Sequence, residues 1–550
     1  MKNITRIFFL CIILVCSIVI AEAQNKYYFI SFNKKDTSNF SKLNPINYLS
    51  KASIERRLKL NLPPLNFNDI RVDTAYIKLV SPFIISYQYQ LNWLNGLVVK
   101  ADDEIIKEIS KFDFVNEIKQ IGIENSIVKD KPIDLNERIN ALEQRFDNKE
   151  FIDSNLYYGK ATDQILFNNI DKLHELNFKG NDIDIAVFDA GFNNFNKVNY
   201  FNCNKIKGTY NLNGEDENEL ASETDDHGLN VLSIMAANVP YKFVGTAPNS
   251  NYYLFSTENS NFEYPIEEYN WAKAAEIADS IGVSIIISSL GYSEFDDKLF
   301  NHKVKEFSGD KTIIAKVVNL ASKNGILVIV SAGNEGNKIW ETITTPADAD
   351  SVLSVGSCNF FYKNSIFSSI GISKRNKFRP QIVTIGELVD FVSKDAKIVK
   401  GNGTSYATPI IAGGVACLMQ AFPNASNFNI KQMIALGSNN YNNPNKYIGY
   451  GTPNFLLTYQ LLENYKQDTI IDVTELEDKN FHVCIHSNAK QKIQILITSM
   501  DGKSLIKQTE RVELNVNRFC LNKTFKLKKG LYILKIKTAN TVLIKQIDKK

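Results

Sequence analysis

Ser405 lies in a stretch whose residue types suit a nucleophile. Residues 401–405 are small or carry a hydroxyl, and the apolar run 410–418 that follows predicts a buried helix. A serine at such a loop-to-helix junction lies where backbone N–H groups converge and where the helix dipole favours negative charge. The plainer interpretation is an N-cap serine, because serine is also a preferred capping residue. A chemical role for Ser405 therefore needs partners elsewhere in the chain.

An aspartate and a histidine could be those partners. Asp189 follows directly on an apolar run, and an acid in that place can be buried against an imidazole and fix its tautomer. His227 alone among the five histidines is followed by a glycine and an apolar helical run, 231–237. Its neutral ring would accept the Ser405 proton and later return it to a leaving amine. Taken singly, Asp189 also fits an ordinary turn and His227 a structural helix-end histidine.

Two further segments could contact a substrate. Asn334 follows the apolar run 326–330, and its side-chain amide could donate to an oxyanion beside the Ser405 N–H. Ser289, Leu290 and Gly291 follow the apolar run 284–288, where an exposed edge could pair with an extended substrate backbone. Each of these peptides alone is also typical of a tight turn.

The elements that must position these residues alternate between apolar and helical runs. Nearly continuous apolar runs indicate strands that are covered on both faces, as in a parallel sheet. Ligands of such sheets bind at the carboxyl ends of the strands, where the candidate residues lie. The sequence therefore predicts an α/β fold with a doubly wound parallel sheet. The predicted strands are 183–188, 252–255, 284–288 and 326–330, and the predicted helices are 227–237, 266–281 and 311–324.

The segment 403–409, Gly-Thr-Ser-Tyr-Ala-Thr-Pro, closely resembles the nucleophile motif of the subtilisin-like serine peptidases. The chain order Asp189, His227, Ser405 is also the order in that family. The resemblance covers roughly residues 155–460. It implies an α/β/α sandwich that cleaves peptide bonds through an acyl-enzyme, with these three residues as the triad. It further implies Asn334 as the oxyanion donor and residues 289–291 as the substrate-binding edge.

The sequence departs from the family pattern at a few positions. Ala190 stands where the family usually has a threonine after the aspartate, and Leu229 and Asn230 follow Gly228 where the family usually has Gly-Thr after the histidine. None of these positions transfers a proton, so we expect altered geometry or specificity, not inactivity. No cofactor and no metal ligand is predicted. Many relatives hold structural calcium, but the sequence shows no clear acidic cage, so calcium stays unassigned.

Residues 1–23 predict a signal peptide. A basic start precedes the apolar run 7–20, and Ala21-Glu22-Ala23 fits a cleavage site. The alternative is a membrane anchor, but the run is shorter than the roughly 20 residues of a spanning helix. No later stretch has the composition of a membrane-spanning segment.

Residues 24–125 alternate strand and helical patterns and predict a small α+β sandwich. In its place before the peptidase-like region, this part resembles the pro-domain of the family, which templates folding and blocks the cleft. The alternative is an independent accessory domain. Residues 126–154 are charged and polar, which predicts a linker suited to processing. Residues 155–465 would then form the peptidase domain.

A second linker, 466–479, precedes a predicted β-sandwich over 480–550. The turn 501–503, the segment 529–534 and the basic end 545–550 together resemble the C-terminal sorting domain of Bacteroidetes type IX secretion. That resemblance implies the type IX machinery as a partner, with export through the periplasm and outer membrane to a secreted or cell-surface location. The alternative is a β accessory domain for carbohydrate or surface attachment. Cys484 and Cys520 flank these strands and could pair, which the sequence does not settle.

Composition excludes several classes. With 63 basic and 60 acidic residues and no concentrated basic patch, the chain does not fit a nucleic-acid-binding protein. The scattered cysteines form no CxxC pair, so neither a zinc framework nor a dense disulfide framework is expected. The sequence predicts a secreted serine endopeptidase made as a zymogen, with protein or peptide substrates. The alternative is a catalytically decayed scaffold acting in cell-surface binding or adhesion, with Ala190 and Leu229 as early signs of decay.

Overall fold

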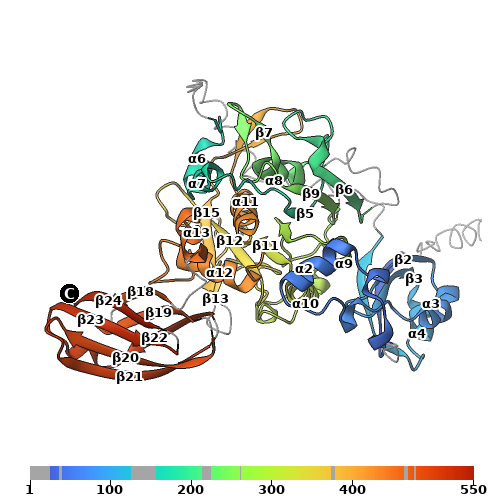
Figure 1. Ribbon diagram of the computed structural model, residues 1–550. Helices are drawn as coiled ribbons and strands as arrows, with labels where there is room; N and C mark the ends of the chain where they lie inside the picture. Colours follow the sequence, from blue (N-terminus) through green and yellow to red (C-terminus); the bar gives the residue numbers. More distant parts are fainter. Residues whose placement is uncertain are drawn as a thin grey trace, which may run out of the picture.

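The computed structural model has an α/β core with a smaller β-containing part at each end of the chain (Figure 1). It describes residues 25–35, 40–124, 157–213, 225–259, 262–372, 378–463, 469–475, 479–487, 489–513, 515–539 and 541–549. The predicted signal peptide and the predicted linker 126–154 lie outside these residues. Within them, no helix combines the length and the apolar character that crossing a membrane requires.

Seven parallel strands form the central sheet, in the spatial order β15-β12-β11-β10-β5-β9-β6. Helices cover both of its faces. In β5, Ile185 and Val187 belong to one apolar core, whereas Ala186 and Phe188 belong to the other. The predicted parallel α/β fold is confirmed. The strands are β5 (Asp184–Asp189), β6 (Ile206–Asn211), β9 (Asn251–Ser256), β10 (Ile285–Ser288), β11 (Leu327–Ser331), β12 (Leu353–Cys358) and β15 (Ile382–Ile385).

The helices divide between the two cores. α9 and α10 share the core that contains Phe188, and the other helices pack in the core that contains Val187. α9 has the bounds that the sequence predicts, whereas α10 is shorter at both ends than its predicted range. The helices are α6 (Thr162–Leu166), α7 (Ile170–Glu175), α8 (His227–Ala236), α9 (Ile266–Ile281), α10 (Ile313–Lys323), α11 (Thr404–Ala421), α12 (Asn427–Leu436) and α13 (Phe455–Glu463).

The N-terminal domain, residues 25–124, is an antiparallel sheet in the order β2-β3-β1-β4 with helices on one face. Strand alternation gives it two apolar faces. Phe29 and Val98 join the core around α9, whereas Ile30 and Val99 pack in the domain's own core. The elements are β1 (Lys26–Phe32), α2 (Lys51–Lys59), α3 (Thr74–Val80), β2 (Ser86–Leu91), β3 (Gly96–Ala101), α4 (Asp103–Ile109) and β4 (Val115–Ile123).

The C-terminal domain, residues 469–549, consists of two antiparallel sheets, β18-β19-β22 and β21-β20-β23-β24. Its first strand lies in residues that the sequence predicts as the linker 466–479, because it pairs with β19. They share one apolar core, to which Val483 contributes from the first sheet and Ile495 from the second. Pairing of β19 with β22 sets Cys484 opposite Arg518, so the two cysteines of this domain are not directly opposed. The strands are β18 (Thr469–Glu475), β19 (Phe481–Ser487), β20 (Gln491–Ser499), β21 (Ser504–Val512), β22 (Asn515–Leu521), β23 (Gly530–Lys537) and β24 (Val542–Lys549).

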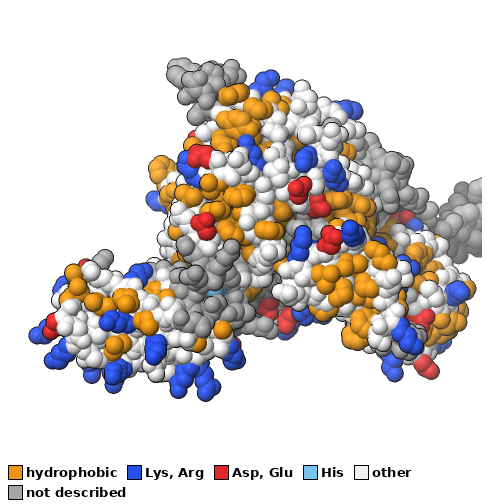
Figure 2. Space-filling model, in the orientation of Figure 1, with side chains coloured by type: hydrophobic (Ala, Val, Ile, Leu, Met, Phe, Trp, Pro, Cys, Tyr) orange, Lys and Arg blue, Asp and Glu red, His pale blue; other side chains and the backbone are white. Residues whose placement is uncertain are grey.

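Basic side chains gather on the visible face of the C-terminal domain (Figure 2). On β20 and β21, Lys492, Lys507 and Arg511 are exposed. A solvated, charged sheet face of this kind limits edge and face association of the domain. Its assignment as a sorting domain stays a prediction.

Candidate active site

The candidate catalytic residues lie where the parallel strands of the central sheet end. Asp189 is the last residue of β5, Ser289 directly follows β10, and Asn334 lies just beyond the end of β11. His227 is the first residue of α8, and Ser405 is the second residue of α11. Since the carboxyl ends of parallel strands meet at one edge, residues far apart in the sequence converge there.

Asp189 and His227 form a direct contact. His227 Nδ1 lies 2.6 Å from Asp189 Oδ1, and the carboxylate is fully buried while 33% of the imidazole is exposed. Gly228 allows this approach, because a Cβ at that position would lie 2.8 Å from Asp189 Cβ and 2.6 Å from the carbonyl oxygen of Gly191. An Nδ1–H that donates to the carboxylate leaves Nε2 as the nitrogen that can accept a proton.

The surroundings of His227 tune its basicity. Burial lowers the pKa of the ring, but the carboxylate of Asp189, together with Asp225 and Asp226, raises that pKa to about 9. Asp189 Oδ1 also accepts the N–H of Ala190 at 2.9 Å, whereas Oδ2 has no hydrogen-bond partner among the described residues. Ala190 follows this carboxylate, at the position where the family usually has a threonine hydroxyl. The contact between Asp189 and His227 is present, but Asp189 Oδ2 has no donor among the described residues.

A proline in α11 changes which group donates a hydrogen bond to the Ser405 carbonyl. Pro409 lies four residues further along α11 and has no N–H, so it cannot donate to the Ser405 carbonyl as a helix residue normally would. The hydroxyl of Ser289 donates to that carbonyl instead, at 3.0 Å. In return, the Ser405 hydroxyl donates to the Ser289 carbonyl at 3.3 Å. The candidate nucleophile and the candidate substrate-binding segment are therefore hydrogen-bonded to each other in both directions.

Asn334 is oriented by the residue before the serine. Its Oδ1 accepts both the backbone N–H of Thr404, at 3.0 Å, and the Thr404 hydroxyl, at 2.9 Å. Because the amide oxygen is engaged twice, the NH₂ group is fixed on the other side of the side chain. Its Nδ2 lies 3.7 Å from the position that a Cβ of Gly403 would take. The amide can therefore serve as a donor close to the nucleophile loop.

The segment Ser289–Gly291 offers a free backbone edge. Ser289 is buried, Leu290 is half-buried and Gly291 is exposed. Within the described chain, the backbone groups of Leu290 and Gly291 bond to no other backbone group. Gly291 also lies against Thr344, whose Oγ1 would be 2.1 Å from an added Cβ. Such an edge suits pairing with an extended peptide.

The structure thus groups the predicted residues in two linked sets. Asp189 pairs with His227, and Ser405 is joined to Ser289 and, through Thr404, to Asn334. Tyr406, next to Ser405, connects the sets, since its ring centroid lies 6.1 Å from that of His227. The Ser405 hydroxyl bonds to Ser289, not to the imidazole, in this state. Catalytic hydrogen bonds are often long without substrate and tighten only when it binds.

Two family models match the chain. The model described as the subtilase family matches residues 180–451, the part that contains all of these residues. The chain carries a subtilase domain. A model described as the peptidase S8 propeptide domain of Bacteroidota matches residues 27–134, which confirms a propeptide before the subtilase domain. Neither matched range reaches the C-terminal domain.

Curated relatives of the subtilase domain are distant in sequence. Subtilisin DY from Bacillus licheniformis is 25% identical over 272 residues, which cover 49% of this chain and 88% of that protein. The human membrane-bound transcription factor site-1 protease is 25% identical over 324 residues, 56% of this chain. Subtilisin-like protease SBT6.1 from Arabidopsis thaliana is 25% identical over 316 residues, 54% of this chain. The chain spans only 28% of the human protein and 27% of the plant protein.

A solved structure supports the same fold. The epidermin leader peptide processing serine protease (EpiP) from Staphylococcus aureus matches with a TM-score of 0.51 and 17% sequence identity. The match covers 80% of this chain and 99% of the EpiP chain. The similarity therefore extends over most of the described residues before the C-terminal domain.

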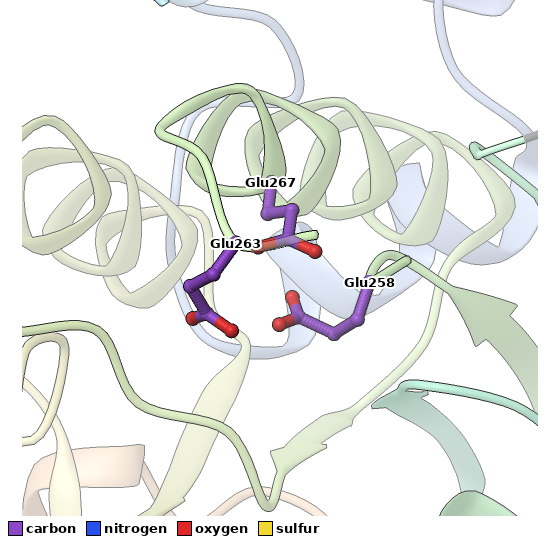
Figure 3. A group of neighbouring side chains, drawn as sticks. All are labelled: Glu258, Glu263 and Glu267. Atoms are coloured by element: carbon purple, nitrogen blue, oxygen red, sulfur yellow. The ribbon is translucent and has the colours of Figure 1, made fainter. Parts of the chain in front are cut away.

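Three glutamates lie together in and before helix α9 (Figure 3). Glu258, Glu263 and Glu267 each bring a carboxylate oxygen within 4.8 Å of the others, and Glu258 accepts the hydroxyl of Tyr292. The sequence shows no clear acidic cage, because these glutamates lack the spacing of a calcium-binding loop. Ca²⁺ takes 6–8 oxygen ligands in proteins, from carboxylates, carbonyls and water, and each of these residues brings one carboxylate oxygen to the cluster. Burial raises the pKa of Tyr292, and the glutamates raise it further.

Sequence reasoning missed two residues that orient the site. Thr404 fixes the Asn334 amide, and Pro409 frees the Ser405 carbonyl for Ser289. In the segment 403–409, the spacing of Pro409 from Ser405 carries a signal, whereas that of Thr404 does not. A proline four residues after a serine at a helix start predicts an acceptor that must find a donor outside the helix.

Proposed function

We propose that this chain is a secreted serine endopeptidase, made as a zymogen, that cleaves peptide bonds through Ser405. The observation that carries the proposal is the 2.6 Å contact between Asp189, at the end of β5, and His227, at the start of α8. The start of α11, which carries Ser405, is hydrogen-bonded to Ser289 and Asn334 beyond the ends of β10 and β11. Propeptide and subtilase models in that order along the chain support the zymogen. The free backbone edge at residues 289–291 can pair with an extended peptide, so the proposed substrates are proteins or peptides.

The proposed reaction has two steps, acylation of Ser405 and hydrolysis of the acyl-enzyme. Ser405 Oγ forms a bond to the carbonyl carbon while its proton passes to His227 Nε2, and the carbonyl electrons move to the oxygen. The Asn334 amide and the Ser405 N–H donate to this oxyanion. Collapse of the intermediate breaks the C–N bond, and His227 returns the proton to the leaving amine. A water molecule then releases the acyl group by the same sequence of proton transfers.

Asp189 has a supporting part in this mechanism. Its carboxylate holds the imidazole in the tautomer with a proton on Nδ1 and stabilises the ring once Nε2 is protonated. A decayed scaffold is not favoured, because the chain keeps an acid, an imidazole, a serine and an amide donor at the strand ends. Ala190 and Leu229, which could have signalled decay, replace none of these groups.

Export and sorting are part of the proposal. The signal-peptide pattern of residues 1–23 supports transfer across the inner membrane. The resemblance of residues 480–550 to a type IX sorting domain supports passage across the outer membrane to a secreted or cell-surface location. Mass spectrometry of the two termini of the exported protein tests this, because a mature form that keeps residues 1–23 or an intact C-terminus would contradict it.

A fluorophosphonate probe tests the catalytic proposal. The wild-type protein should be labelled on Ser405 and should hydrolyse a peptide substrate. Ser405→Ala should remove labelling and lower turnover by about 10⁶-fold, the loss that follows removal of the nucleophile in subtilisin. A circular dichroism spectrum equal to that of the wild type controls for folding. Turnover of Ser405→Ala near the wild-type rate would refute the role of this serine.

A further inference from the structure

The C-terminal domain carries an excess of positive charge that the rest of the chain does not share. Residues 480–550 contain fifteen lysines and arginines but four aspartates and glutamates, a net charge of +11. The whole chain has a net charge of +3, so its other residues are acidic when taken together. Such an asymmetry between parts of one chain indicates a partner of opposite charge for the basic part.

The first sheet of this domain faces the subtilase domain. On β19 and β22, Cys484 and Arg518 are directly opposed and point away from the domain's own core. The Arg518 guanidinium lies 4.8 Å from the ring centroid of Tyr441 and donates to Asn442 Oδ1 at 3.0 Å. Tyr441 and Asn442 belong to the subtilase domain, so the second sheet, β21-β20-β23-β24, lies on the far side of the C-terminal domain (Figure 1).

Five cations share the outer face of the second sheet, which we call the basic face (Figure 2). Alternate residues of the inner strand β20 point into the core, so Lys492, Gln494 and Leu496 point outward. Residues directly opposite each other on neighbouring strands lie on the same face of a sheet. The register of β21 and β23 sets a cation opposite each of these three residues. The five cations are Lys492, Lys507, Arg511, Lys535 and Lys537.

These cations have no carboxylate partner among the described residues. The ion pairs of the domain involve other lysines, at positions 490 and 549. One carboxylate, Asp548, shares the face, but it lies beside Leu531 at the end of the sheet away from Lys492. Like charges oppose the stacking of two such faces, so a surface of opposite sign is the partner that they favour.

Exposed aliphatic side chains lie among the cations. Ile544 is opposite Lys535 and 64% exposed, and Val542 is opposite Lys537 and 51% exposed. Tyr532 is the single aromatic residue of the four strands, and it packs against the core. The basic face therefore lacks the aromatic platforms on which nucleic-acid bases stack. Cations interleaved with exposed aliphatic groups are typical of surfaces that lie on anionic membranes.

We propose that the basic face docks on an anionic lipid surface. Its lysines and Arg511 lie near the lipid phosphate groups, and Ile544 and Val542 contact the apolar layer beneath them. Because Arg518 contacts the subtilase domain from the opposite sheet, docking leaves that domain on the side away from the lipid. The proposal concerns the chain that still carries its C-terminal domain, and it does not depend on the proposed peptidase activity.

The test uses the chain from residue 24 onward with Ser405→Ala, which removes the apolar segment 7–20 and prevents self-digestion. The protein is sedimented with vesicles of phosphatidylcholine, either alone or with about one third phosphatidylglycerol. We expect binding to the anionic vesicles only, and loss of that binding as NaCl rises from about 0.1 M to about 0.5 M, because the cations are exposed and screened. Equal binding to both kinds of vesicle, or binding to neither, would overturn the proposal. Binding to heparin beads without binding to anionic vesicles would assign the face to a soluble polyanion and also overturn it.

Variants then locate the contact. The double variant Lys507→Gln, Lys537→Gln should bind anionic vesicles roughly 30-fold more weakly, which corresponds to about 1 kcal/mol for each lysine. Lys51→Gln with Lys107→Gln is the matched control, since it removes the same charge from exposed positions of the N-terminal domain and should keep the original affinity. An unchanged affinity in the first pair, or an equal loss in the control pair, would overturn the basic face as the docking surface. Ile544→Ser should also weaken binding, and an unchanged affinity there would overturn the contact with the apolar layer. All five positions lie on the surface, and circular dichroism spectra equal to that of the parent chain control for folding.

Discussion

Glu276 on α9 should make the attachment of the N-terminal domain depend on pH. Its Oε1 accepts the N–H of Trp93 at 2.7 Å, whereas its Oε2 has no hydrogen-bond partner among the described residues. Only 8% of the residue is exposed, and this burial raises the pKa of the carboxyl from 4.5 to about 7, against the opposing effects of Lys273 and Lys35. The proposed perturbation is Glu276→Gln, which keeps the acceptor for Trp93 and removes the charge.

The direction of the pH dependence follows from the raised pKa of Glu276. When the N-terminal domain leaves, Glu276 becomes hydrated and its pKa returns toward 4.5, so docking takes up a proton. The contribution of this carboxyl to docking is complete below pH 4.5 and is lost as the pH rises to about 7. A difference of 2.5 pKa units corresponds to about 3 kcal/mol, or roughly 300-fold in the dissociation constant.

In the assay, the chain is cut within residues 125–156, and dissociation of the N-terminal domain from the rest of the chain is measured between pH 5 and pH 8 by size exclusion or a fluorescence label. Across this range the wild-type dissociation constant should rise by roughly 70-fold through Glu276. Glu276→Gln should lose that rise and bind more tightly than the wild type at pH 8. The pKa of Lys35 is lowered to about 8 by burial, so Lys35 titrates nearby with the opposite sign, and the difference between wild type and variant at each pH isolates Glu276. Glu55→Gln, an exposed carboxyl of α2, is the control. Equal pH dependence in wild type and Glu276→Gln would refute the reasoning.

Four further predictions concern the catalytic site. Asp189→Asn should lower turnover by about 10⁴-fold and move the pKa of His227 down from about 9. Since the base must be neutral to accept a proton, the rise of kcat/KM with pH should shift from near pH 9 to lower pH. An unshifted pH profile would contradict the pairing of Asp189 with His227. Asn334→Leu should lower kcat by about 10²–10³-fold with little change in KM, as for the corresponding donor of subtilisin, and a change confined to KM would contradict an oxyanion role. Gly228→Ala places a methyl group against the Asp189 side chain, so turnover should fall while urea unfolding stays cooperative; wild-type turnover would show that the close approach is not needed. Ala190→Ser offers a donor to the unsatisfied Asp189 Oδ2 and should raise the free energy of unfolding by about 1 kcal/mol in urea titrations, whereas a decrease would show that the hydroxyl does not reach it.

The sequence predicts four of the seven central strands, β5, β9, β10 and β11, because these buried parallel strands are short and almost entirely apolar. The helix 266–281 was predicted to the residue, since Gly282 ends it in the left-handed conformation, φ 104°. Strands β6, β12 and β15 are not predicted. Half of the residues of β6 are polar, β12 carries serines among its apolar residues, and β6 and β15 lie at the two edges of the sheet. In the N-terminal domain, residues 93–99 predict a strand from their sequence pattern, but strand β3 begins only at Gly96, because the preceding residues form a turn with Asn95 at φ 49°.

The candidate site was predictable in its residue types but not in its supporting contacts. Chain order and strand ends identified Asp189, His227 and Ser405 as candidates. The bond from Thr404 to Asn334 spans 70 residues, and the gathering of three glutamates depends on how a loop folds against α9. Such contacts are set by tertiary packing, for which local pattern and propensity hold no signal.

The proline in α11 has a mechanical consequence. Because Pro409 provides no N–H, the backbone carbonyl of Ser405 takes its hydrogen bond from Ser289, which belongs to the edge where a peptide would dock. A shift of that edge by even a few tenths of an ångström would be transmitted directly to the backbone of the attacking residue. Binding of a peptide at this candidate edge and the position of the Ser405 hydroxyl would then change together, without any moving domain between them.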